Sequence, residues 1–241
     1  MIHPFRWLLL ICVLGTSVRA DFSRDLARIH AEAVGGRMKV NALKTLKASG
    51  VTRTDEGELK FIIWAARPDL IRTEVNGGGR TVVQAWDGDS DPWMADSKTR
   101  KITRMAGTMA EDFKNDAEFD DALLAGKDRK ISLDYAGEKN IEGRPLLEVV
   151  VTQNFTSTSF VYLDPVSFMI VRRDILRRRK GIEVRVRTDY SDFRKVGGVT
   201  LPHRLVVSQN GVKMHETIIE KMEANPEFPA GLFKIPATAT P

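Results

Sequence analysis

The sequence predicts a mainly β protein, in which a curled antiparallel sheet forms a barrel or half-barrel and helices cover its inner face. Two observations lead to this fold class. From Thr45 onward apolar residues recur with a period of two over many short segments, and glycine or proline turns separate most of these segments. A sheet of roughly a dozen sequential strands must curl to hide its apolar face.

The first twenty residues are expected to be a signal peptide. Arg6 gives a basic start, Trp7–Leu14 is an apolar run, and the following residues end in the small Ala20. We therefore expect export, with cleavage after Ala20. Cys12 lies in the removed segment, so the mature chain has no thiol for a disulfide, for thiol catalysis or for a cysteine zinc site.

The rest of the chain has the composition of one mildly basic domain. Removal of residues 1–20 takes away Arg6 and Arg19, so the formal charge falls from +5 to +3. No Pro- or Ser-rich linker divides the remainder, and no later apolar run is long enough to span a bilayer. We expect a single domain over residues 21–236, a disordered tail at 237–241, and a monomer.

A helix is expected at the start of the mature chain. Asp21 or Ser23 would cap its beginning, and Gly35-Gly36 would end it. A second turn is expected over Met38–Leu43. The apolar residues with helical spacing are Leu26, Ile29, Ala33 and Val34.

The strands follow from the segments of period two. After the strand from Thr45, the segment Glu58–Val75 contains two strands hinged at Arg67-Pro68, because proline cannot lie inside a central strand. This hinge places Arg67 at the rim of an apolar sheet. The further strands are expected at Thr81–Trp86, Asp91–Asp96, Lys101–Met105, Ile131–Tyr135, Leu146–Thr152, Ser157–Leu163, Phe168–Leu176, Ile182–Tyr190, Val199–Ser208 and Val212–Ala224.

The polar interruption Gly107–Leu124 is expected to be an amphipathic cover for the sheet. Met109 and Phe113, and then Phe119 and Leu123, stand four residues apart, which is helical spacing. We expect it to be either a core helix that plugs the barrel end or a movable lid over a lipid pocket. Its outer, solvent-facing side would carry Glu111, Asp112, Asp116, Asp120 and Asp121.

Several short motifs follow one another along nearly the whole mature chain. They are the helix ending in Gly35-Gly36, Arg67-Pro68 with Asp69–Arg72 after it, Trp86-Asp87-Gly88, Tyr162–Pro165, Tyr190–Arg194 leading to Gly198–Pro202, and finally Asn225, Phe233 and Pro236. In this order they resemble the LolA-type family of periplasmic lipoprotein carriers. The resemblance implies an open half-barrel with helices over its concave face, located in the periplasm.

The resemblance also implies a function without catalysis or cofactor. In that family the cavity receives lipoprotein acyl chains from an inner-membrane ABC transporter and delivers them to an outer-membrane receptor. Arg67 would hold the lid shut, and the five N–H donors of its guanidinium suit several carbonyl acceptors. The other interpretation of Arg67 is a cap on the strand end. An envelope sensor or adaptor of the same fold, binding a protein partner or a lipid signal, is the alternative function.

Two groups of residues are candidates for contact with a ligand or partner. The pocket is expected to be lined by Phe61, Ile63, Trp64, Trp86, Trp93, Met109 and Phe113, with core packing as the alternative interpretation. The second group is a basic hairpin tip that would touch anionic headgroups or an acidic partner, with a solvated strand end as its alternative. It consists of Arg177, Arg178, Arg179 and Lys180. Nucleic acid is disfavoured because no aromatic side chains interleave with these cations.

The histidines give no metal or catalytic pattern. His30 is expected to be a partly exposed helix residue, and His203 and His215 lie on neighbouring predicted strands where they could meet. Two histidines alone make a poor metal site. A hydrolase therefore ranks third among the possible functions.

Overall fold

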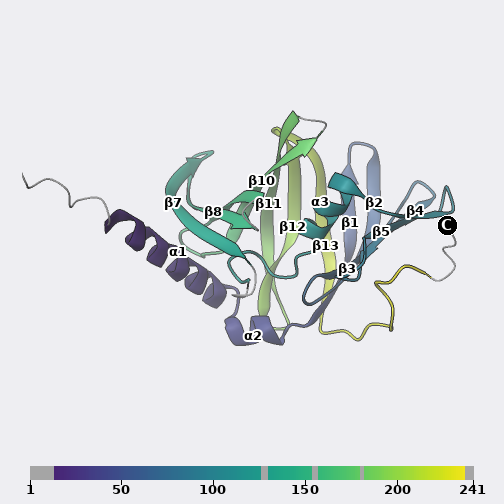
Figure 1. Ribbon diagram of the computed structural model, residues 1–241, viewed down its shortest axis with the longest axis horizontal. Coiled ribbons are helices and arrows are strands. Elements are labelled where there is room, and N and C mark those ends of the chain that lie inside the picture. Colours follow the sequence, from purple (N-terminus) through teal and green to yellow (C-terminus); the bar gives the residue numbers. More distant parts are fainter. Residues whose placement is uncertain (1–13, 126–129, 154–156, 180–181, 237–241) are drawn as a thin grey trace, which may run out of the picture.

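The computed structural model describes residues 14–125, 130–153, 157–179 and 182–236, and these residues form one open antiparallel sheet with helices over one face (Figure 1). Residues 1–13 of the expected signal peptide, the expected tail at 237–241 and the tip residue Lys180 lie outside the described residues. The helices are α1 (Leu14–Ala33), α2 (Arg37–Ala42) and α3 (Gly107–Asp116).

Thirteen strands make up the described sheet, in the order β6-β5-β4-β3-β2-β1-β13-β12-β11-β10-β9-β8-β7. They are β1 (Thr45–Thr54), β2 (Gly57–Ala66), β3 (Leu70–Gly77), β4 (Arg80–Trp86), β5 (Trp93–Asp96), β6 (Lys101–Arg104), β7 (Ile131–Ile141), β8 (Arg144–Gln153), β9 (Ser157–Leu163), β10 (Ile170–Arg179), β11 (Ile182–Val196), β12 (Val199–Gln209) and β13 (Val212–Ala224). The expected mainly β fold and half-barrel are confirmed, because β6 and β7 stay at opposite edges of the sheet.

The strand order explains why a segment must cover the concave face. The first six strands form one wing, the last seven form the other, and the wings meet where β1 pairs with β13. The chain leaves the first wing at β6, on one edge, and enters the second at β7, on the far edge. The link between them therefore has to cross the sheet, and α3 lies in this link (Figure 1).

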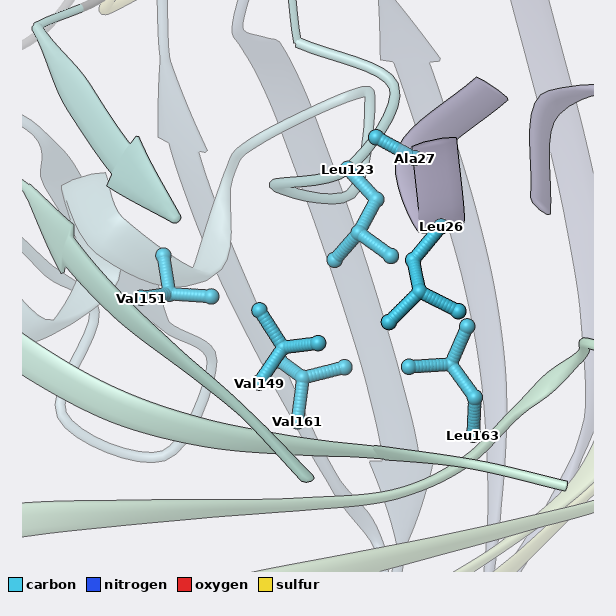
Figure 2. Packing of buried hydrophobic residues seen from close by; sticks show 7 residues of the cluster. All are labelled: Leu26, Ala27, Leu123, Val149, Val151, Val161 and Leu163. Atoms are coloured by element: carbon cyan, nitrogen blue, oxygen red, sulfur yellow. The ribbon is translucent and has the colours of Figure 1, made fainter. Parts of the chain in front are cut away.

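Helix α1 packs over the second wing beside β7 (Figure 1). Figure 2 shows Leu26 of this helix facing side chains of β8 and β9, among them Val149 and Leu163, and Ala27 belongs to the same cluster. Leu123, from the link after α3, joins the same cluster, and all seven side chains shown are buried. The N-terminal helix and the link thus share one apolar core with the sheet.

The N-terminal helix differs from expectation at its start. It already begins at Leu14, and Ser23 is no cap: the Ser23 hydroxyl accepts a hydrogen bond of 2.8 Å from the backbone N–H of Tyr135, on the edge strand β7. The end of the helix agrees with the expectation. Gly35 has a φ of 133°, and a Cβ there would overlap the carbonyl oxygen of Gly198, so the glycine also lets α1 approach the β11–β12 turn.

The two faces of the first wing have different covers. Directly paired residues of an antiparallel sheet share a face, so the register places Trp64, Arg72 and Trp93 on one face and Ile63 and Trp86 on the other. Carbonyls of the C-terminal segment, at residues 232 and 233, accept hydrogen bonds on the first of these faces, from Arg72 at 3.4 Å and Trp93 at 2.9 Å. That face is the convex one.

The junction of the two wings contains a glycine that tolerates no side chain. The β1–β13 register shifts between Ser49 and Gly50, and a Cβ on Gly50 would overlap the carbonyl oxygen of Ile218. We expect Gly50→Ala to lower the free energy of unfolding by about 1–3 kcal/mol, because the strands would have to separate locally. Urea denaturation of this variant beside Ser49→Ala, its neighbour on the same strand, measures the effect. Equal stability of the two variants would contradict this account of the junction.

Candidate ligand cavity and its lid

We call residues 107–125, which comprise α3 and the irregular segment after it, the lid. The expected helix over Gly107–Leu124 is only partly right, because the helix ends at Asp116. Beyond it, the carboxylate of Asp121 accepts hydrogen bonds from the backbone N–H groups of Leu123 at 2.9 Å and Leu124 at 3.1 Å. This local turn competes with a continued helix.

Arg67 lies at the end of β2, where its side chain joins α2 to the lid. Its Nε donates to the carbonyl oxygen of Leu43 at 2.7 Å, and Nη2 donates to that of Val40 at 2.8 Å. Nη1 and Nη2 also donate to the two carboxylate oxygens of Asp120, Nη2 at 2.7 Å. The guanidinium lies over the ring of Phe119, 4.7 Å from its centroid. One arginine therefore donates to two carbonyls at the end of α2 and binds the lid through a bidentate ion pair.

His30 makes the second contact between the helices and the lid. The expectation that it is partly exposed is wrong, because only 1% of His30 is exposed. Its Nε2 lies 3.1 Å from a carboxylate oxygen of Asp121, and Nδ1 lies 2.8 Å from the carbonyl oxygen of Phe168. Helical periodicity cannot reveal this pairing, since the partner lies 91 residues away.

The ion pair shifts the titration of both of its members. Burial lowers the pKa of His30, but attraction and hydrogen bonding by Asp121 and the Phe168 carbonyl outweigh it, so the pKa is raised. Burial raises the pKa of Asp121, but His30 and the backbone N–H groups of Leu123 and Leu124 outweigh it, so the pKa is lowered. Both shifts favour the charged pair.

Two further arginines complete the attachment of the lid. Arg177 of β10 makes ion pairs with Asp112 at 3.5 Å and Asp116 at 2.6 Å, both on α3. Arg37, at the start of α2, donates to the carbonyl oxygen of Leu124 at 2.7 Å. The expectation that the acidic residues of the lid all face solvent is therefore wrong, because Asp112, Asp116, Asp120 and Asp121 bind cations of the body.

A cavity of about 360 Å³ lies between the lid, the ends of α1 and α2, and the concave face of the sheet. This volume is within the range of small-molecule sites. Its walls are mostly apolar and carry polar groups along the lid. The apolar lining is Val34, Val40, Leu43, Leu46, Phe119, Ala122, Leu124, Val161, Met169, Ile170, Phe193, Val199, Leu201 and Pro202, and the polar lining is His30, Arg67, Asn115, Asp116, Glu118, Asp120, Asp121, Arg173, Tyr190 and Thr200.

The seven residues expected to line the pocket lie elsewhere. Phe61 and Ile63 share the face of the cavity but belong to a separate packing cluster with Ala48 and Ile219. Trp86 lies under α3, with the ammonium of Lys114 5.9 Å from its ring centroid.

The other four expected lining residues lie on the convex face or on the lid helix. Trp64 and Trp93 are on the convex face, where Trp93 lines a different hollow of about 560 Å³. On the lid helix, Met109 is exposed, Phe113 is partly buried and Ala110 is the buried residue. The predicted lining is thus wrong for this cavity, because a period-two pattern does not show which face the helices cover.

Of the four cations expected at the basic hairpin tip, the structure describes the side chain of Arg177. Arg177 points to the concave face and binds the lid, so it is no part of a free patch. The side chains of Arg178, Arg179 and Lys180 lie outside the part of the chain that the structure describes. His203 and His215 do not meet, because His215 pairs with Val207, four residues further along β12 than His203.

The solved structures that superimpose on this chain include proteins from three bacteria. No family model matches the sequence, and no curated protein matches it. A DUF1329 family protein from Desulfovibrio piger superimposes with a TM-score of 0.63 at 12% identity, over 90% of this chain and 97% of the other. A putative outer membrane lipoprotein-sorting protein domain from Vibrio parahaemolyticus gives 0.58 at 10% identity, over 89% and 97%. A LolA superfamily protein from Nitrosomonas europaea gives 0.54 at 10% identity, over 85% and 97%.

This chain has the LolA-like fold. Identities of 10–12% show shared architecture and leave the ligand open. The expected fold resemblance is confirmed in these terms. Within the described part of the chain, no helix combines the length and apolar character needed to cross a bilayer.

The Arg67–Asp120 ion pair predicts strong energetic coupling. Both side chains are about four-fifths buried, so a double-mutant cycle of Arg67→Leu and Asp120→Asn should give a coupling energy of about 1–3 kcal/mol. The exposed pair Arg53–Glu58 is the control and should give less than about 1 kcal/mol. A coupling between Arg67 and Asp120 as small as that of the control would contradict the assigned contact.

The His30–Asp121 pair predicts a pH dependence with a definite sign. Because the pKa of His30 is raised, its contribution is fully present below its ordinary value of 6.5 and is lost as pH rises through the raised value. The stability difference between wild type and His30→Gln should therefore shrink above pH 6.5, with a slope of at most about 1.4 kcal/mol per pH unit. Urea denaturation between pH 5 and 9 measures it. His215→Gln is the control with opposite sign: burial lowers the pKa of His215, so the stability difference between wild type and this variant should shrink as pH falls below 6.5.

Proposed function

We propose that the protein is a periplasmic carrier that binds lipoprotein or lipid acyl chains in the cavity beneath its lid and helps to deliver them to the outer membrane. The observation that carries the proposal is the largely apolar cavity of about 360 Å³ closed by a lid held through ion pairs. Burial of an acyl chain provides about 0.8 kcal/mol per methylene group without any specific polar partner.

The manner of lid attachment supports reversible opening. Arg67, Arg177 and Arg37 hold the lid through polar groups that water can satisfy when the lid lifts. An apolar seal would instead expose its whole area to water. In this proposal Arg67 is the gate: it binds the lid when the cavity is empty and releases Asp120 when an acyl chain enters.

The setting of the carrier follows from the proposal. The expected signal peptide supports a periplasmic location, and the likeness to a lipoprotein-sorting domain supports the choice of cargo. An inner-membrane ABC transporter would be the donor and an outer-membrane receptor the acceptor. No catalytic residue or cofactor is needed, because the chain transfers a bound molecule unchanged.

An envelope sensor or adaptor is the second candidate. The observation in its favour is the edge strand β7, which spans eleven residues and pairs only with β8 in the described sheet. An extended peptide of a partner protein can add to such an edge. Helix α1 packs against β7 and Ser23 already takes one of its N–H groups, so this candidate ranks below the carrier.

Native mass spectrometry of protein purified from an envelope fraction, followed by lipid extraction, tests the carrier function. We expect acyl-bearing species on the wild type and about tenfold less on Leu201→Trp, whose indole would fill the cavity from β12. We expect Arg67→Leu to keep the fold and to exchange its ligand faster, because the lid loses its bidentate contact.

Arg53→Leu is the matched control, since Arg53 is an exposed arginine on the neighbouring strand β1 and pairs only with Glu58 among the described residues. It should behave as the wild type. Wild-type protein without any acyl-bearing species, or equal recovery from Leu201→Trp, would refute the carrier function. Unchanged exchange in Arg67→Leu would refute the gate and leave Arg67 as a strand cap.

A further inference from the structure

Arg173 and Tyr190 stand together on the sheet floor of the cavity. Arg173 of β10 pairs directly with Thr188 of β11, so Tyr190, two residues on, is its diagonal neighbour on the same face. Val161 of β9 pairs with Arg173 from the other side, and Arg173, Tyr190 and Val161 all line the cavity. A cation and a phenol are therefore presented at one place on an apolar floor.

Arg173 differs from every other cation at the lid. Arg67, Arg177 and His30 each bind a lid carboxylate, whereas the Arg173 guanidinium has no hydrogen bond or ion pair to any residue that the structure describes. It is partly buried in a mostly apolar wall. Its nitrogens are not among the fully buried side-chain atoms without a partner, so its N–H donors stay accessible to water or to a ligand in the cavity.

The acidic residues of the cavity wall leave this cation available. Asp116 is bound by Arg177, Asp120 by Arg67 and Asp121 by His30. Glu118 accepts a hydrogen bond from the side-chain amide of Gln153. The lid carboxylates are thus already engaged, and Arg173 is the positive group that a ligand would meet.

We propose that the cavity selects amphiphiles with an anionic head, a carboxylate or a phosphate, which Arg173 binds while the acyl chain lies along the apolar wall. This inference rests on the proposed carrier function and specifies its ligand class. The planar fork of a guanidinium matches the oxygens of both head groups.

Tyr190 supplies the second donor. Burial raises the pKa of Tyr190, and Asp121 and Asp116 add to that effect, while Arg173 and a hydrogen bond with Thr188 oppose it without cancelling it. The phenol therefore stays protonated at neutral pH and can donate its O–H to an anion. The apolar side chains Leu201 and Phe193 continue the wall beside this pair of donors.

Three single-chain lipids separate the head group from the chain. Lysophosphatidate and monopalmitoylglycerol differ only by a phosphate, and palmitate provides the carboxylate. Their binding is measured by displacement of the neutral fluorescent probe N-phenyl-1-naphthylamine from the full chain. We expect both anionic lipids to bind wild type about tenfold or more tightly than monopalmitoylglycerol, since a charge-assisted hydrogen bond is worth roughly this factor. Tight binding of palmitate alone would identify a free acid as the source of the head group, and that of lysophosphatidate alone a phospholipid.

Variants of the two donors test their roles. Arg173→Met should remove the preference for the anionic lipids and leave the affinity for monopalmitoylglycerol unchanged, whereas Arg173→Lys should keep part of the preference. Tyr190→Phe should reduce the preference about twofold to fivefold. Arg53→Met, at an exposed arginine of β1, should behave as wild type. Circular dichroism establishes that each variant is folded.

The outcomes separate this inference from the carrier function. Equal wild-type affinity for all three lipids, or an equal loss of all three in Arg173→Met, would overturn the head-group site while acyl-chain binding stands. If wild type binds neither the probe nor any of the lipids, the carrier function and the head-group site both fail.

Discussion

The structure depends on one topological constraint: the chain has to travel from β6, at one edge of an open sheet, to β7, at the other edge. The link crosses the concave face, where its residues form one wall of the cavity, so this crossing makes it a cover. What the sequence of the link decides is how firmly the cover is held. Its carboxylates meet cations from α1, the end of β2 and β10, namely His30, Arg67 and Arg177.

The balance between polar and apolar contacts differs along the lid. At its C-terminal end, Leu123 is buried against α1 and the sheet, and Leu124 is buried in a second cluster with Val34 and Val199. At its helical end, Ala110 is the buried residue of α3, and Arg177 supplies the ion pairs. Since reversing apolar burial exposes the whole apolar area to water, whereas water can satisfy the charged groups of a separated ion pair, the two ends differ in how easily they lift. In the proposed carrier, α3 moves and Leu123–Leu124 stays as the anchor.

Prediction from sequence succeeded where the signal is local. Alternation of apolar and polar residues located the strands, and Pro68 placed the end of β2 correctly, because these effects act within a few residues. The strand ends were predicted less accurately: β7 continues to Ile141 through a bulge between Tyr135 and Gly137 that alternation does not reveal. The helical interpretation of the lid failed after Asp116, where the Asp121 carboxylate makes its own turn.

By itself, the sequence determined the mainly β class, the position of the strands, the cover between β6 and β7, and Arg67 as a charge that needs a partner. Only the tertiary structure decided which partner and which face. Trp64 and Ile63 are neighbours in an apolar strand, yet one lies on the convex face and the other on the concave face. The sequence predicted a partly exposed helix residue at His30, but in the structure both ring nitrogens are paired, with the Asp121 carboxylate and the Phe168 carbonyl. The physical reason is the same in each case: burial and ion pairing here join residues far apart in the chain, so no local pattern specifies them.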